Sequence, residues 1–199
     1  KTKLEARTKM LKGEWPGRGC EHCKSTEDAG GHSDRMSHLN MQGVTAPKEL
    51  EEDTTAVNVT PTQLEIYFGN TCNLKCLYCN SKFSSTIDNE NRINGKWVHG
   101  DQKDFGKHLY LPGKIEINPN IEEDTDKLFT WLEEHIHELN KVMILGGEPF
   151  LQKETERMVE LLERMSNPNL TLVVFSNLTV DPARVQKWLA RMWNLVEQG

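Results

Sequence analysis

The 199-residue chain lacks the features that would place it in a membrane or on a nucleic acid. It has no apolar run that approaches the ~18 residues of a membrane-spanning helix, and no secretory signal opens it. Its 24 Lys and Arg against 30 Asp and Glu give a net charge of −6, so the basic footprint that would wrap a nucleic acid is absent. Only 36% of residues are hydrophobic. Clustered Ile, Leu and Val runs nevertheless exclude a wholly disordered chain.

Cysteine is scarce as well, and its five residues are an odd number that cannot pair completely within one chain. Cys20 and Cys23 form a close pair, and Cys72, Cys76 and Cys79 form a cluster. Thiols this close together in sequence typically bind a metal or carry out redox chemistry. Such thiols persist in reducing compartments, so we expect a cytoplasmic protein.

The first part of the chain, residues 1–60, is expected to be an N-terminal appendage. Residues 1–12 have helix-forming composition and are followed by Gly13, a typical C-cap residue. The rest of the appendage has many glycines and few aliphatic runs, which predicts loop-rich structure. A metal could hold it together through a C-x2-C knuckle formed by Cys20 and Cys23.

The remainder, residues 61–199, is expected to be an α/β domain. Strand and helix patterns alternate three times, which predicts a parallel sheet with right-handed crossovers. The predicted strands are 64–69, 141–145 and 170–175, and the predicted helices are 122–139, 152–165 and 182–197. Asp181 is the expected N-cap of the last helix. The residues expected on the buried face of that helix are Val185, Leu189, Met192 and Val196, widened by Trp188 and Trp193. Residues 114–118 are a candidate for a short edge strand.

Each chemically unusual segment follows one of these strands. The cysteine cluster follows the first strand, a Gly-Gly-Glu-Pro segment follows the second, and Ser176 and Asn177 follow the third. Ligands of parallel α/β sheets bind at the carboxyl ends of the strands. The sequence therefore predicts a single site at that edge.

The cluster has the spacing C-x3-C-x2-C, and three thiolates suit a soft metal. A structural zinc site needs a fourth ligand, and none follows in the next turn. Three ligands on a [4Fe–4S] cluster would leave one iron open for a substrate group. A zinc knuckle that borrows a distant His is the competing interpretation.

The segment CNLKCLYC resembles the signature of the radical S-adenosylmethionine (radical SAM) enzymes. The resemblance implies that Cys72, Cys76 and Cys79 hold a [4Fe–4S] cluster whose open iron is chelated by SAM. An electron from the cluster then cleaves SAM to methionine and a 5′-deoxyadenosyl radical, which abstracts hydrogen from a substrate. The cofactors supply this chemistry, and the protein orients and shields them.

Further residues match the family pattern. Tyr78, just before the third cysteine, corresponds to the aromatic residue near the adenine of SAM. The segment of Gly146, Gly147, Glu148 and Pro149 corresponds to the one whose backbone and acidic residue receive the SAM amino group. An ordinary strand-to-helix turn is the competing interpretation of that segment.

Ser176 and Asn177 correspond to the polar position that often contacts the ribose or carboxylate of SAM, although helix-entry turn chemistry would also explain them. The resemblance covers about residues 62–197. The family barrel usually has six βα units and the sequence provides about three, so we expect a partial (β/α)6 barrel with an open edge at the third strand. Because the chain begins with Lys, we favour a fragment over a barrel completed by a second polypeptide.

Cys20 and Cys23 resemble the N-terminal segment of twitch/SPASM-type radical SAM proteins, in which a small extra domain can hold an auxiliary cluster. The further ligands would come from a missing C-terminal part or from His22, His32 or His38. Auxiliary iron–sulfur ligation, zinc binding, and a substrate-contacting or unligated pair all stay open. A disulfide is disfavoured in a reducing compartment.

The resemblance thus implies a radical SAM enzyme served by an electron donor such as flavodoxin or ferredoxin. The favoured substrate is a peptide or protein, and a small molecule is the alternative. The competing class is a non-catalytic iron–sulfur or zinc module, such as an electron carrier. We expect no nucleic-acid and no membrane partner. No residue is assigned as a substrate acid or base.

Overall fold

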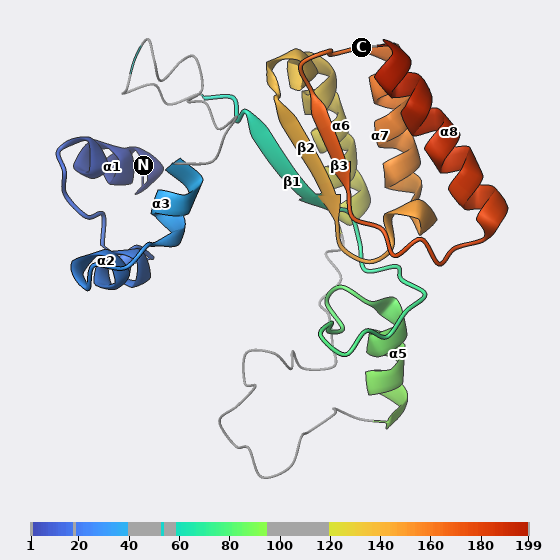
Figure 1. Cartoon of the computed structure of the whole chain (residues 1–199), viewed down its shortest axis with the longest axis horizontal. Coiled ribbons are helices and arrows are strands. Elements are labelled where there is room, and N and C mark those ends of the chain that lie inside the picture. The colour runs from blue at the N-terminus through green and yellow to red at the C-terminus, as the bar shows by residue number, and fades with distance from the viewer. Residues whose placement is uncertain (1, 18, 40–52, 54–58, 95–119, 199) are drawn as a thin grey trace. The chain divides into compact units, whose positions relative to one another are not determined.

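The structure, a computed structural model, describes residues 2–17, 19–39, 53, 59–94 and 120–198. Its contacts divide the chain into an N-terminal unit, Lys1–Thr62, and a C-terminal unit, Gln63–Gly199 (Figure 1). The expected edge strand at 114–118 lies outside the described residues. Among the helices that are described, none is long and apolar enough to cross a membrane.

The described residues of the N-terminal unit form three short helices, α1 (Thr2–Leu11), α2 (Glu21–Asp28) and α3 (Asp34–Leu39). The prediction of a first helix is confirmed. Gly13 has φ +75°, and Glu14 N donates to Lys9 O at 2.9 Å, as in a Schellman C-cap.

The prediction of loop-rich structure after Gly13 is wrong where α2 and α3 form. Polar side chains, which carry no hydrophobic period, stabilise these two helices. Glu27 of α2 accepts hydrogen bonds from Ser33 and Arg35. Ser33 Oγ in turn accepts from Met36 N at 3.2 Å at the start of α3. Helices held by such local bonds leave no apolar stripe in the sequence.

The C-terminal unit is built on a three-stranded parallel sheet, so the α/β prediction is confirmed. Its strands are β1 (Gln63–Tyr67), β2 (Lys141–Leu145) and β3 (Thr171–Val174). They lie in the order β1-β2-β3. In register, Leu64 lies beside Val142, which lies beside Leu172; Ile66, Ile144 and Val174 form the next such row.

The described helices of this unit are α5 (Ser85–Asn94), α6 (Ile121–His135), α7 (Lys153–Arg164) and α8 (Pro182–Gln198), with short 3-10 turns at Ile136–Glu138 and Pro149–Leu151. The last three helices confirm the sequence prediction. Helix α5, which comes first of the four along the chain, was not predicted, because its sequence STIDNENRIN is mostly polar. Ser84 begins it by accepting a hydrogen bond from Ile87 N at 3.3 Å.

The buried core lies on one face of the sheet. Ile66, Val142 and Ile144 pack there against side chains of α6 and α7, such as Leu132 and Met158. The alternate residues point to the opposite face, where Tyr67 is exposed and Met143 and Leu145 are half-buried. In the described residues there are two clusters of buried apolar side chains. One contains Ile66, Val142 and Ile144, and the other packs against Val174, which lies on the same face of the sheet. The strands therefore carry their helices on a single face.

Helix α8 begins as predicted, since Asp181 Oδ1 accepts from Ala183 N at 2.9 Å. Its buried face is only partly the expected one. Trp188 is buried and stacks on Phe150 with 5.3 Å between ring centroids, and the large ring sets the rotation of the helix. Val185, Met192 and Leu195 pack on the core with it. The expected core positions Leu189, Trp193 and Val196 are exposed.

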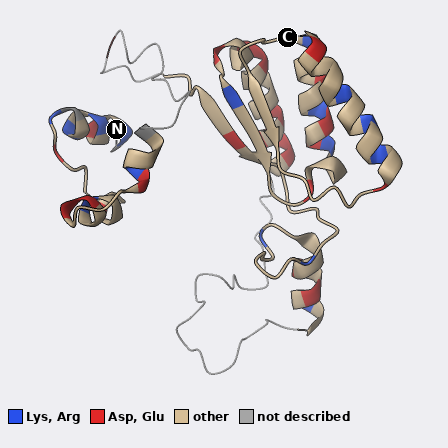
Figure 2. Cartoon of the chain, viewed as in Figure 1, with Lys and Arg blue, Asp and Glu red and all other residues tan. Residues whose placement is uncertain are grey.

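Charged side chains join neighbouring helices across their outer surfaces, and Figure 2 shows both signs interspersed along α7 and α8. Lys187 of α8 bonds Glu156 of α7 at 2.9 Å, and Arg191 bonds Glu163 at 2.7 Å. These hydrogen bonds lower the pKa of each glutamate. The outer charges therefore fasten α8 to α7, with the modest strength of surface pairs.

Candidate functional site

A loop of residues 68–84, here called the cysteine loop, leaves the carboxyl end of β1 and enters α5. Its base is closed by Asn70, whose O accepts from Ser85 N at 2.7 Å and whose Nδ2 donates to Ser81 O at 3.1 Å. Cys72 N donates to Ser85 Oγ at 3.1 Å. The loop is thus fixed to the start of α5 on both sides of Cys72.

The interior of the loop is held by hydroxyl groups that the sequence analysis did not single out. Ser84 and Thr86 both donate to Leu74 O at 2.7 Å. Ser84 is fully buried. The signal was available, because a Ser-Ser-Thr run before a helix is a typical source of capping hydroxyls.

Cys72, Cys76 and Cys79 are unpaired, half-buried thiols of this loop. Burial raises the pKa of Cys79, and the neighbouring Cys72 and Cys76 raise it further. The three thiols therefore share one electrostatic environment. They do not surround a common point, since no three His, Cys, Asp or Glu side chains among the described residues are grouped to hold a metal ion.

Tyr78 projects from the same loop and is 90% exposed. A hydrogen bond with the Cys76 thiol raises the pKa of Tyr78, and the charge of the neighbouring thiols adds to this rise. Its ring is therefore available to pack on a ligand beside the thiols.

The segment of residues 146–149 follows β2 and packs directly under the cysteine loop. Gly147 N donates to Phe83 O at 3.1 Å, and Glu148 N donates to Thr71 O at 2.7 Å. Gly146 and Gly147 have φ of +79° and +57°. A Cβ on Gly147 would lie 2.4 Å from Thr71 O. Glycine is thus needed for the close approach of the two loops.

Glu148 joins this segment to the end of β3. Its side chain is completely buried and accepts three hydrogen bonds: from Phe150 N at 3.1 Å, Ser176 Oγ at 2.7 Å and Asn177 N at 2.8 Å. Pro149 beside it is buried as well. The second and third predicted segments are therefore in direct contact.

The third segment also reaches the cysteine loop. Asn177 Nδ2 donates to Asn73 Oδ1 at 3.2 Å, and Asn73 Nδ2 donates to Thr179 O at 3.0 Å. Asn73 and Thr179 were not predicted as site residues. Their partners lie more than 100 positions away in sequence, so no local pattern signals them. The three segments expected to form one site do lie together at the carboxyl edge of the sheet.

A scan against protein-family models matches residues 66–196 to the Radical SAM superfamily. The match spans well over half of the chain. The chain belongs to the radical SAM superfamily. No curated protein and no solved structure matched the chain. The match is to the superfamily as a whole, so the twitch/SPASM subtype stays a prediction.

The chemistry of the donor set fits the iron–sulfur cluster that radical SAM proteins generally use. Three soft sulfur donors on one loop suit iron. The Cys79 thiol, whose pKa burial and the neighbouring Cys72 and Cys76 raise, would gain from a cationic centre, because metal binding releases its proton. Cys72, Cys76 and Cys79 are the residues that would hold the cluster.

In this radical SAM chain, the second thiol pair lies in the N-terminal unit. Cys20 precedes α2 and Cys23 lies in its first turn. A cavity of about 440 Å³ is lined by both cysteines, Trp15 and Arg35. The Arg35 guanidinium lies 4.9 Å from the centre of the Trp15 ring. His22, His32 and His38 form no metal-binding group with these cysteines within the described ranges.

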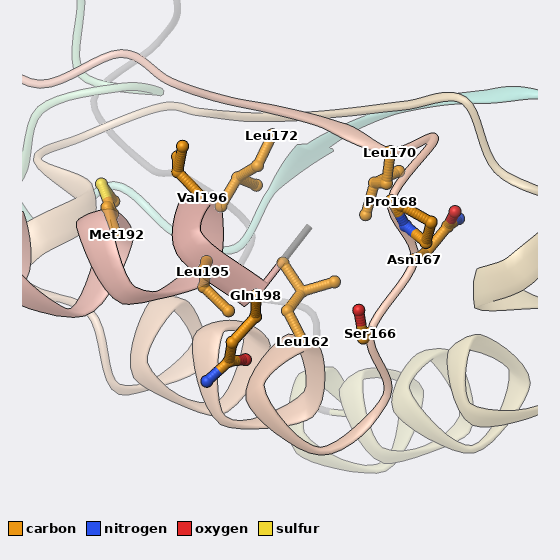
Figure 3. A pocket seen from close by; sticks show the side chains of 10 residues that line it. All are labelled: Leu162, Ser166, Asn167, Pro168, Leu170, Leu172, Met192, Leu195, Val196 and Gln198. Carbon is orange, nitrogen blue, oxygen red and sulfur yellow. The ribbon is translucent and has the colours of Figure 1, made fainter.

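An apolar cavity of about 430 Å³ lies elsewhere in the radical SAM domain, between the ends of α7 and α8 and the start of β3 (Figure 3). Leu170, Leu172 and Leu195 line it. Helices that follow parallel strands end at the amino edge of the sheet, so this cavity is at the edge opposite to the cysteines. It is not part of the candidate site.

Proposed function

We propose that the chain is a radical SAM enzyme whose Cys72, Cys76 and Cys79 hold a [4Fe–4S] cluster. When bound, the cluster supplies the electron that cleaves SAM to methionine and a 5′-deoxyadenosyl radical, which abstracts hydrogen from a substrate. The substrate class that we favour is a peptide or protein, with a small molecule as the alternative. The electron donor would be a small redox protein such as flavodoxin or ferredoxin.

One observation carries this proposal: three segments from the ends of β1, β2 and β3 are joined by direct hydrogen bonds at one edge. Glu148 N bonds Thr71 O in the cysteine loop, the Glu148 carboxylate bonds Ser176 and Asn177, and Asn177 returns to Asn73. An electron carrier needs its cysteines but not this second and third segment. Their assembly favours a site that holds a ligand beside the cluster.

Within that site, the residues would divide the work of binding SAM. Tyr78 is exposed beside the thiols and offers a ring face for the adenine. Residues 146–149 supply a tight backbone turn, and Ser176 and Asn177 supply half-buried polar groups. The buried packing beneath them keeps this edge fixed.

The fold of the family would place this sheet in a partial (β/α)6 barrel. Two features support that placement. The strands carry α6, α7 and α8 on a single face, as the strands of a barrel do. In addition, β3 pairs only with β2 in the described part of the chain, which leaves an edge where a further strand would add.

For the N-terminal unit we propose that Cys20 and Cys23 bind an auxiliary iron–sulfur cluster or zinc together with further ligands. Their shared cavity supports a joint role for the two thiols.

The test is anaerobic reconstitution of the full chain with iron and sulfide, followed by reduction, addition of SAM and measurement of 5′-deoxyadenosine. We expect product from the wild type and none from Cys76→Ala, which should also lose most of the [4Fe–4S] absorbance. Leu189→Ala, at an exposed position of α8, is the control and should keep both the radical SAM cluster and the product. A cluster-loaded wild type without product would indicate a non-catalytic module. A Cys76→Ala variant that keeps cluster and activity would refute the ligand assignment.

A further inference from the structure

Glu148 is the one acidic side chain in the described residues that is completely buried. The family resemblance assigns the acidic residue of this segment to the SAM amino group, yet the carboxylate already has three partners from its own chain. We propose that Glu148 is a positioning residue: it fixes Ser176 and Asn177 and, through Asn73, the cysteine loop, and it does not itself receive the SAM ammonium. This inference rests on the proposed function.

The accepted bonds occupy both oxygens of the carboxylate. Oε1 accepts from Phe150 N and from Ser176 Oγ, and Oε2 accepts from Asn177 N. The side chain has no exposed surface. An ammonium group could therefore reach the carboxylate only if the packing around it opened and disturbed the bonds to these donors.

The bond from Ser176 decides what this serine can offer to a ligand. Its one hydroxyl proton is donated to Glu148, and its oxygen accepts from Leu178 N at 3.0 Å. Ser176 therefore has a lone pair but no proton left. It can accept from an ammonium or hydroxyl group, and it cannot donate to the carboxylate of SAM. Because Glu148 accepts the hydroxyl proton of Ser176, Ser176 can act toward a ligand only as a hydrogen-bond acceptor.

The same carboxylate supports an unusual turn. Leu178 has φ +54°, a left-handed conformation that is unfavourable for leucine and persists only where the surroundings enforce it. Three successive amides of this turn bond to side chains: Asn177 N to Glu148, Leu178 N to Ser176 Oγ, and Thr179 N to Asn177 Oδ1 at 2.8 Å. Glu148 is the acceptor that ties this set to the core.

The turn then fixes the cysteine loop. Asn177 Nδ2 donates to Asn73 Oδ1, and Asn73 Nδ2 donates to both O and Oγ1 of Thr179. Asn73 is the residue next to Cys72. A displacement of the turn would therefore change the placement of the first cluster ligand.

Glu148→Gln is the sharpest test because it keeps the shape and removes one acceptor. Whichever way the amide is turned, its NH₂ group faces a backbone donor, either Asn177 N or Phe150 N. We therefore expect hydrogen exchange of amide 150 or of amides 177–179 to be at least about tenfold faster in the variant, measured by mass spectrometry on the full chain without SAM. Glu122→Gln is the matched control, since Glu122 is 85% exposed, and should exchange like the wild type.

SAM binding is then measured on the cluster-loaded proteins by calorimetry. A positioning role predicts weaker SAM binding together with the faster exchange. If Glu148→Gln weakens SAM binding while amide 150 and amides 177–179 all exchange at the wild-type rate, Glu148 contacts the ligand directly and the inference is wrong.

Asn73→Ala keeps the inference testable should Glu148→Gln fail to fold. It removes the link between the turn and the cysteine loop and leaves the Glu148 bonds intact. We expect SAM to bind several-fold more weakly, with unchanged iron content and wild-type exchange at amide 177. Unchanged SAM affinity would refute the link. If no variant and no wild type forms 5′-deoxyadenosine, the proposed function fails, while the exchange rates still decide the role of Glu148.

Discussion

Replacing Gly147 by alanine tests whether the two loops at the carboxyl edge are packed as closely as the structure shows. The added Cβ would lie 2.4 Å from Thr71 O, 2.9 Å from Gln152 Nε2 and 3.0 Å from Asn70 C. Two of these neighbours are backbone atoms. They cannot move aside without moving the start of the cysteine loop.

Two costs add at this position. The φ of +57° is left-handed, which costs an L-residue about 1–2 kcal/mol. Relief of the overlap costs about 1–3 kcal/mol, as in other overpacked interiors. We therefore expect Gly147→Ala to lower the free energy of unfolding by about 2–5 kcal/mol. At about 3 °C per kcal/mol for a protein of this size, the Tm falls by roughly 6–15 °C.

Gly69→Ala is the matched control. Gly69 lies on the cysteine loop that Gly147 contacts, has no left-handed φ, and would place its Cβ with nothing within 4 Å. A glycine of this kind tolerates alanine with a change within about 1 kcal/mol. Thermal unfolding followed by circular dichroism compares the two. If Gly147→Ala and Gly69→Ala unfold within about 2 °C of each other, the close contact of the two loops is refuted.

Three further predictions concern the framework of the sheet and helices. Leu132→Ala removes a side chain with no exposed surface and should lower the free energy of unfolding by about 2–5 kcal/mol. Leu189→Ala, at a position of α8 that is 53% exposed, should change it by no more than about 0.5 kcal/mol. If urea titrations gave the same loss for both variants, Leu189 would be buried and the observed rotation of α8 would be contradicted. Asp181→Ala should cost about 1 kcal/mol through loss of the cap on Ala183 N, and Asp181→Asn, which keeps an acceptor oxygen, should recover most of it in the same assay. Hydrogen bonds from Lys187 and Arg191 lower the pKa of Glu156 and Glu163 from 4.5, so their contribution to stability is present above pH 4.5 and is lost as the pH falls through the lowered values. The Tm of the wild type should therefore fall more steeply below pH 4.5 than that of Arg191→Gln, and parallel curves would show that these bonds do not stabilise the fold.

The strands and helices of the core were predictable, because apolar residues occur in them as continuous runs or at helical spacing. The sequence KVMIL, residues 141–145, was predicted as a strand and is β2 to the residue. A continuous apolar run also predicted β3, and helical spacing predicted helices α6 to α8. The polar helices α2, α3 and α5 escaped this reasoning, since capping bonds such as Ser84 to Ile87 N stabilise them instead.

The face of α8 shows where a period is insufficient. Helical spacing predicted that Leu189 and Val196 face the core. The residues that precede them, Trp188 and Leu195, have the same spacing and fit a helical face equally well. The choice between these stripes depends on Phe150, which stacks on Trp188 and belongs to a different element.

The candidate site was predictable in its segments but not in its bonds. Parallel topology alone indicated that the cysteines, residues 146–149 and Ser176 share an edge. It could not indicate that Asn73 and Asn177, 104 positions apart, bond to each other. Nor could it indicate that the Glu148 carboxylate faces the core, because that depends on three donors meeting in space.

The strands of the sheet follow one another in space as they do in the chain, and this order bears on how the protein folds. β2 and β3 are separated only by α7, so their pairing closes a short loop and is favoured early. β1 must close a far longer loop to reach β2. We expect the β2–α7–β3 part to form the folding nucleus and β1 to dock on it afterwards. The cysteine thiols that follow β1 would then be positioned last, against segments after β2 and β3 that have already folded.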